Sequence, residues 1–176
     1  MKPILLFALT CLLSVSVETQ QSSPTPPRAL HAQDVMAISI PAAVRQNVSA
    51  TLEYRDTDTI KGVLFDLNED GISDYIVQSS ASLCGTGGCG YSIVDGASRN
   101  RLGDVFGDPL YVLATKVRGY FVIETYGHLN ARSGKFVTYE FGGTAYTVRT
   151  TQLVEGASVD SLFAKLDRIP RWRPRP

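Results

Sequence analysis

The sequence is poor in cysteine, has no excess of either charge sign and contains no apolar run long enough to cross a bilayer. Three of its 176 residues are cysteine, and 17 basic residues balance 17 acidic ones. A chain without a broad positive field is not built to attract nucleic acid, so we expect no nucleic-acid partner. The uncharged apolar stretch near the N-terminus, residues 3–17, is shorter than the roughly 20 residues that a membrane-spanning helix needs.

Patterns that signal common enzyme chemistry are also missing. The chain has no G-x-S-x-G or H-E-x-x-H sequence and no cysteine–histidine pair free for nucleophilic catalysis. His128 follows a strong strand pattern, but a solitary histidine in a turn is more often solvated than catalytic. The length suits one well-buried core and is too short for two ordinary enzyme domains. These absences favour a single domain that does not catalyse a reaction.

The first residues have the layout of an export signal. Met1 and Lys2 give a positively charged start, and residues 3–17 follow as an uncharged apolar segment. Small residues near its end fit a cleavage site after Ser16, so we predict a signal peptide over residues 1–16 and a periplasmic or secreted protein with no membrane span in the mature chain. Two alternatives stay open. One is an anchor that is never removed, and the other is lipidation at Cys11, which lacks the usual small residue before it.

The rest of the chain divides into three parts by composition. Residues 17–34 are polar, contain three prolines and show no apolar period, which predicts a linker. A single β-rich domain is expected over residues 35–168. Residues 169–176 form a basic tail of arginine and proline around Trp172. This tail is either a cationic docking segment or a solvated, frayed end, and we favour the frayed end.

Strand patterns dominate the central domain. Short runs rich in β-branched and aromatic residues are separated by turns rich in Gly, Asn and Asp. Near the C-terminus, apolar residues at helical spacing predict a helix over Ser158–Leu166 with Ser158 as its N-cap. We therefore predict a mainly β fold (β-rich α+β), an antiparallel sheet, open barrel or sandwich with one C-terminal helix. The expected strands are residues 49–55, 61–67, 75–77, 91–94, 109–114, 120–126, 135–141 and 145–150.

One segment carries recognisable metal chemistry. From Asp66 to Asp74 the chain reads D-x-N-x-D-G-x-x-D, so oxygen ligands alternate along a loop that a glycine allows to turn sharply. In such a loop the side chains of Asp66, Asn68, Asp70 and Asp74 converge on one point with the carbonyl of Ile72. Calcium matches this set because it takes many hard oxygen donors at flexible geometry. We predict a structural Ca²⁺ ion, and the alternative is an Asp- and Asn-rich hairpin turn without an ion.

The same segment resembles the calcium loops of FG-GAP/VCBS-type repeats, as in integrin α-chain propellers, where a similar stretch joins two strands. Strand-like residues flank it here, whereas an EF-hand would have helices and a glutamate at the twelfth position, which is Val77 in this chain. The resemblance covers residues 62–78 and occurs once. It implies a calcium loop with the ligands named above, and it does not imply a multi-bladed propeller.

The two cysteines beyond the signal peptide, Cys84 and Cys89, enclose a glycine-rich loop. An even number of cysteines in an exported protein predicts a disulfide, and the glycines let the backbone turn tightly enough to close so small a ring. A redox pair, a zinc site and a phosphate-binding loop each lack the required spacing or partners. We hypothesise that this loop and the aspartate loop present one surface, and that Thr86 enters a partner's cleft.

Three functions from different classes fit these features. The first is an exported domain that binds another envelope or extracellular protein, for example as an inhibitor or immunity protein of a cell-envelope hydrolase. The second is a calcium-dependent glycan-binding or adhesive module that uses aromatic side chains such as Tyr91 and Tyr111. The third is a small hydrolase that uses the metal or His128. We favour the first.

Overall fold

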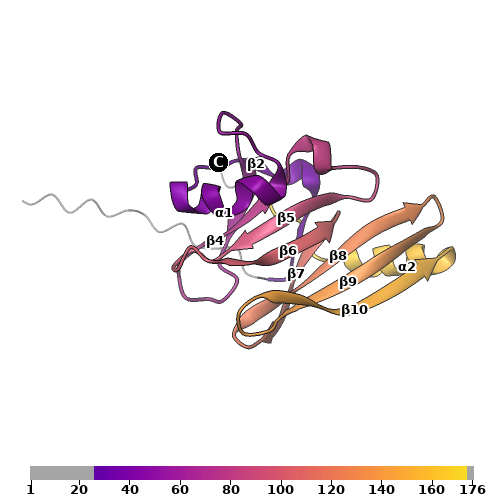
Figure 1. The fold of residues 1–176 in the computed structure, drawn as a ribbon. Coiled ribbons are helices and arrows are strands. Elements are labelled where there is room, and N and C mark those ends of the chain that lie inside the picture. The colour runs from indigo at the N-terminus through magenta and orange to yellow at the C-terminus, as the bar shows by residue number, and fades with distance from the viewer. Residues whose placement is uncertain (1–25, 174–176) are drawn as a thin grey trace, which may run out of the picture.

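Two antiparallel sheets stack face to face in the structure, a computed structural model that describes residues 26–173. The predicted fold class is confirmed, because residues 26–173 are mainly β, include a C-terminal helix and do not close into a barrel. The N-terminal sheet has the order β2-β3-β4-β5-β6, and the C-terminal sheet has the order β1-β7-β8-β9-β10 (Figure 1). The first comprises β2 (Met36–Ala37), β3 (Lys61–Phe65), β4 (Asp74–Gln78), β5 (Cys89–Val94) and β6 (Arg101–Gly107). The second comprises β1 (Arg28–Leu30), β7 (Leu110–Val117), β8 (Tyr120–Asn130), β9 (Ser133–Phe141) and β10 (Tyr146–Glu155).

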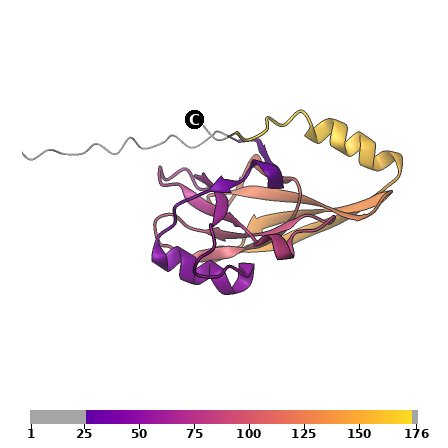
Figure 2. The ribbon, with the colours of Figure 1, turned by 90° about the horizontal axis from the view of Figure 1, so that it is seen from above.

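A helix covers the outer face of each sheet, which gives four layers. Figure 2 shows α2 (Ala157–Leu166) on one side of the stacked strands and α1 (Ala42–Leu52) on the other. The main apolar core lies between the sheets and includes Phe65, Ile93 and Ile123. Alternation along the strands explains this arrangement, since successive side chains point to opposite faces and central strands such as β5 and β8 are covered on both. No helix within residues 26–173 combines the length and the apolar character that a bilayer crossing requires.

Helix α1 replaces the strand predicted over residues 49–55. It follows Pro41, which occupies the N-cap position, and its last buried residue is Leu52. Val44, Val48 and Leu52 recur every four residues and are buried against Val77 and other residues of the N-terminal sheet. The alternating polar and apolar pattern around residue 50 predicted a strand, but the apolar residues spaced four apart form the buried face of a helix instead. Burial of that face against the sheet stabilises the helix.

The folded domain extends further at both ends than its composition predicts. The predicted linker is wrong from Arg28 onward, because β1 pairs with β7 and buries Ala29 and Leu30. The expected frayed tail is wrong for Pro170–Trp172. The N–H of Ala29 donates to the carbonyl of Pro170 at 3.0 Å, and the N–H of Trp172 donates to the carbonyl of Ala29 at 2.6 Å.

Two side chains of the tail hold it against the domain. Trp172 is buried in the core between the sheets, where it covers apolar surface near β1. The Arg171 guanidinium donates two hydrogen bonds of 2.7 Å to the carboxylate of Asp34. The last residue of the described chain, Arg173, is exposed.

Smaller differences concern the ends of elements. The N-cap of α2 is Gly156 rather than Ser158. Strand β6 was not predicted, because glycine and aspartate interrupt its alternating pattern, although Leu102 and Val105 point into the core. Strand β10 runs five residues beyond the predicted end at Thr150.

The docked tail predicts that Trp172 contributes to stability. Replacing Trp172 with alanine removes a buried indole from the core, so the free energy of unfolding should fall by about 3 kcal/mol. Urea unfolding followed by circular dichroism measures this, with Arg173→Ala as the control because that side chain is exposed. Since Trp172 is the single tryptophan, the native protein should also fluoresce at short wavelength. Emission at the wavelength of free tryptophan, with no loss of stability in Trp172→Ala, would contradict the docked tail.

Candidate functional site

The aspartate loop connects β3 to β4 and is organised by the first carboxylate of the motif. Asp66 accepts hydrogen bonds from the backbone N–H groups of Glu69 at 2.7 Å, Asp70 at 3.2 Å and Gly71 at 2.9 Å. Gly71 has a φ of 86°, a conformation in which glycine carries no side-chain penalty. The side chain of Asp66 therefore sits inside the turn that its own loop makes.

The middle of the loop repeats the same kind of local hydrogen bond. The Asn68 side-chain oxygen accepts from the N–H of Asp70 at 3.0 Å, and Asp70 accepts from the N–H of Ile72 at 2.7 Å. The amide of Asn68 also donates to the second carboxylate oxygen of Asp70 at 3.0 Å. Asp70 and Ile72 are exposed. These short-range bonds fix the path of the loop and keep its outer side chains at the surface.

Asp74 closes the loop from the inside. It begins β4, is fully buried, and accepts hydrogen bonds of 2.8 Å from the N–H groups of Leu67 and Gly96. Burial raises the pKa of Asp74 to about 7. The hydrogen bonds from the two N–H groups act in the opposite direction but are outweighed by burial. Gly96 must be glycine for this contact, because a Cβ there would lie 2.2 Å from the carbonyl oxygen of Ser73.

Residues distant in sequence complete the surroundings of this loop. The hydroxyl of Tyr120 donates to Asp95 at 2.9 Å and accepts from the amide of Asn68 at 3.3 Å. Burial raises the pKa of Tyr120 to about 12, so its hydroxyl stays protonated as a donor. The ammonium of Lys116 donates to the Asn68 carbonyl at 3.0 Å and to the Glu69 carboxylate at 2.6 Å. These contacts cross between sheets and could not be read from the local motif.

The five predicted metal ligands lie in one loop but do not form a ready-made ion cage. Asp66 and Asp74 are directed at backbone N–H groups, Asp70 and Ile72 are exposed, and Asn68 is half-buried beside Tyr120. Across residues 26–173, no three side chains of the His, Cys, Asp or Glu types are grouped closely enough to hold a metal. Calcium binding by this loop stays a prediction.

The second candidate site is the loop between β4 and β5, which a disulfide closes. Cys84 and Cys89 are bonded, with their Cα atoms 4.3 Å apart. Inside the ring, Gly85 and Gly88 exchange two backbone hydrogen bonds of 2.9 and 3.0 Å. Thr86 is exposed at the tip, whereas Gly88 and Cys89 are buried.

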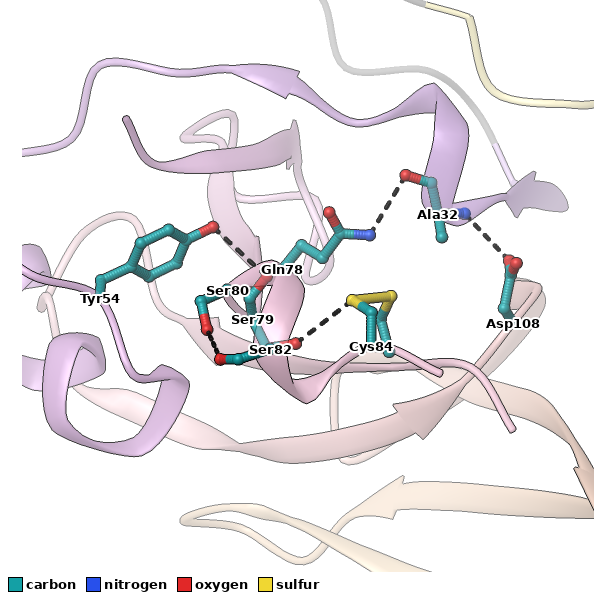
Figure 3. The surroundings of a disulfide bond; sticks show 9 residues. Ala32, Tyr54, Gln78, Ser79, Ser80, Ser82, Cys84 and Asp108 are labelled. Carbon is teal, nitrogen blue, oxygen red and sulfur yellow. Dashed lines mark hydrogen bonds between the residues drawn. A yellow bond between two sulfur atoms is a disulfide. The ribbon is translucent and has the colours of Figure 1, made fainter. Parts of the chain in front are cut away.

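Hydrogen bonds beside the disulfide attach this loop to its surroundings (Figure 3). The hydroxyl of Ser79 lies 3.7 Å from the Cys84 sulfur. The amide of Gln78 donates to the Ala32 carbonyl at 3.2 Å, and the N–H of Ala32 donates to Asp108 at 2.9 Å. The segment that was predicted as a linker therefore helps to hold the base of the loop.

Close backbone packing seats the loop on the rest of the fold. A Cβ on Gly88 would lie 2.4 Å from the carbonyl carbon of Gly107, so no larger residue fits there. A Cβ on Gly87 would lie 3.4 Å from the His128 carbonyl and 3.6 Å from the Phe106 ring. Phe106 and Leu129 are 44% and 54% exposed. The loop therefore packs against the His128 backbone and the Phe106 ring, and the side chains of Phe106 and of Leu129, the residue after His128, face solvent.

The two loops do not share a surface. Asp74 begins β4, and Gln78, at its other end, is followed by Ser79 beside the disulfide. Neighbouring β5 repeats this arrangement, since Cys89 lies at one end and Val94, which pairs with Tyr75, at the other. Strand β4, which separates the two loops, is five residues long, or roughly 16 Å. The hypothesis of one joint surface is wrong, because each loop occupies its own end of the N-terminal sheet.

The structure also shows where the residues named for the glycan-binding and hydrolase hypotheses lie. Tyr91 and Tyr111 are buried, so neither is presented to a glycan. Within the described chain, the Tyr91 hydroxyl is the buried side-chain polar atom without a hydrogen-bond partner. His128 lies near the end of β8, and its Nδ1 atom is 3.1 Å from the Tyr126 hydroxyl.

Comparison with known proteins gives no relative. No family model, no curated protein and no solved structure matches this chain.

Asp74 gives the unfolding free energy a specific pH dependence in metal-free buffer. Its ordinary pKa is 3.8 and its folded-state pKa is about 7, so over that interval the folded state binds a proton that the unfolded state has released. Stability contributed by this group is therefore greatest at low pH and falls as pH rises from about 4 to about 7.

Urea unfolding in EDTA from about pH 5 to pH 7.5 measures this slope. Asp74→Asn cannot titrate, so it should be less stable at low pH through the loss of one N–H acceptor, with a flatter profile. Parallel profiles for the two proteins over this range would contradict the assignment.

Proposed function

We propose that this domain is an exported protein-binding module that docks through its disulfide-closed loop, in the manner of an inhibitor or immunity protein of a cell-envelope hydrolase. The observation that carries the proposal is the combination of a rigid tip and exposed apolar neighbours. Thr86 stands at the tip of a ring closed by a covalent bond and by two backbone hydrogen bonds. The Phe106 ring lies beside that ring of residues, and Leu129 follows His128, whose carbonyl faces Gly87; both apolar side chains are exposed.

The rigidity matters because binding must overcome the entropy lost when flexible groups are ordered. A loop fixed before the encounter loses little conformational freedom on docking, so more of the contact energy remains as affinity. Closed loops of this kind enter clefts, and large apolar side chains near them supply the buried centre of an interface. The Cys84–Cys89 loop with Phe106 and Leu129 meets both conditions.

Export supports the same proposal. A disulfide persists in the periplasm or outside the cell, whereas the cytosol keeps thiols reduced. The bonded pair Cys84–Cys89 therefore agrees with the signal peptide predicted over residues 1–16, which lies outside the described residues.

We also propose that the aspartate loop binds Ca²⁺ in a structural role. Asp66, Asn68, Asp70 and Asp74 would hold the ion with the carbonyl of Ile72. The ligand chemistry fits, because all five donors are hard oxygen atoms within one turn. Asp70 is exposed and would exchange its hydrogen bonds with Asn68 and Ile72 for the ion, whereas Asp74 is buried with a raised pKa. A bound cation would offset the cost of keeping that carboxylate charged.

If the domain docks through this loop, one of two matched variants should lose affinity for the partner and the other should not. Phe106→Asp places a charge beside the disulfide loop, whereas Leu64→Asp places one on an equally exposed apolar site in β3 (44% and 39% exposed). A partner captured from envelope extract with the wild-type domain, then purified, should bind Phe106→Asp at least about tenfold more weakly, a loss of about 1.4 kcal/mol. Thr86→Trp should have a similar effect because it blocks the tip.

Isothermal titration with the purified partner gives the dissociation constants of the wild type and of the three variants. Leu64→Asp should stay within about twofold of the wild type. Equal affinities for wild type, Phe106→Asp and Thr86→Trp would show that docking does not use this loop.

The calcium proposal is tested separately, by thermal unfolding. At about a hundredfold excess over its dissociation constant, Ca²⁺ should raise the midpoint of unfolding by roughly 5–10 °C relative to EDTA. Asp70→Ala should abolish the increase. Glu69→Ala, in the same loop but not among the ligands, should retain it, since its exposed ion pair with Lys116 contributes little. The same midpoint in Ca²⁺ and EDTA would show that the loop does not bind Ca²⁺, and it would not affect the docking proposal.

A further inference from the structure

Strand β10 leaves one long edge of the C-terminal sheet open. It is ten residues long, and seven consecutive residues, from Thr147 to Leu153, are exposed. Its inner edge pairs with β9 along its length, and no strand within residues 26–173 pairs with its outer edge (Figure 1). The opposite edge of this sheet, β1, is covered by a bridge between Ala29 and Arg171. The exposed backbone of β10 is thus available for pairing with another strand.

The edge has few of the features that prevent strand pairing. Its sequence, YTVRTTQLVE, contains no proline, glycine or lysine and is rich in residues that favour strands. One irregularity breaks it, since the register with β9 shifts between Val148 and Thr150. Beyond that bulge, Thr150–Val154 runs in regular register with β9. A regular five-residue segment therefore remains for a partner.

Charges mark the two ends of this segment with opposite signs. Arg149 precedes it and Glu155 follows it. The nearest carboxylate to Arg149 within the described chain is that of Glu140, at 3.8 Å, and the Arg149 side chain is 69% exposed. Such a pair contributes little, so the guanidinium can turn toward another acid.

We propose that a second copy of this chain is the partner, paired antiparallel through β10. With Gln152 facing its own counterpart, Thr151 lies opposite Leu153 and Thr150 lies opposite Val154. The same register places Arg149 of each copy opposite Glu155 of the other, so both ends carry complementary charges. A parallel arrangement would set like charges together. Antiparallel pairing about a two-fold axis is self-complementary, and it joins the two five-stranded sheets into one continuous sheet.

Charge reversal tests this register directly. The chain is expressed from its full coding sequence, and its oligomeric state is measured by sedimentation velocity over a concentration series. A single strand pair is a small interface, so the wild type should dimerise with a dissociation constant on the order of 10–100 µM. Arg149→Glu and Glu155→Arg should each weaken dimerisation at least about tenfold. The double variant, which restores opposite signs, should recover it.

Asp56→Arg is the control, because Asp56 is an exposed acid in the turn after α1. It should dimerise as the wild type does, and circular dichroism should show all variants folded. A wild-type chain that remains monomeric up to about 1 mM would overturn the proposal and leave the edge for a strand of a different protein. Dimers that are insensitive to the single reversals, or a double variant that fails to recover, would also overturn it.

Discussion

The two sheets are joined by a backbone contact that residues with side chains would block. The chain leaves the N-terminal sheet at Gly107, where a Cβ would lie 2.5 Å from the carbonyl oxygen of Tyr126 in β8. That carbonyl accepts a hydrogen bond of 2.6 Å from the N–H of Asp108. On the other side, Gly88 of the disulfide loop packs directly on Gly107. Three segments therefore stack backbone against backbone where the chain passes from one sheet to the other.

This junction determines where the candidate docking surface lies. The disulfide loop rests on the β6–β7 connection, so the same contact that aligns the sheets also fixes the direction of Thr86. Phe106, one residue before Gly107, is left at the surface beside the tip. The aspartate loop lies at the other end of the N-terminal sheet, where buried Asp74 ties the β3–β4 turn to Gly96 after β5. The two loops thus fasten opposite ends of one sheet, and the exposed Phe106 ring lies at the end beside the junction.

Local patterns predicted much of this architecture, and contacts between distant segments explain the rest. The β-branched and aromatic runs located β7, β8 and β9, and apolar spacing located α2. Helix α1 could not be predicted in the same way, because its apolar residues Val44 and Val48 are buried only by contact with the N-terminal sheet, which lies far away in sequence. Cysteine spacing identified the closed loop, but not the nearby Phe106. The ion pair between Asp34 and Arg171 links the two ends of the domain, which no local pattern can show.

Docking through the disulfide loop requires a tip that is rigid before any partner binds. Backbone ¹⁵N relaxation by NMR measures this motion residue by residue. We predict order parameters for Thr86 and Gly87 of about 0.85, equal to those of the flanking strands. Values below about 0.6 at these two residues would show a flexible loop, and the docking surface would then lose the physical basis argued for it.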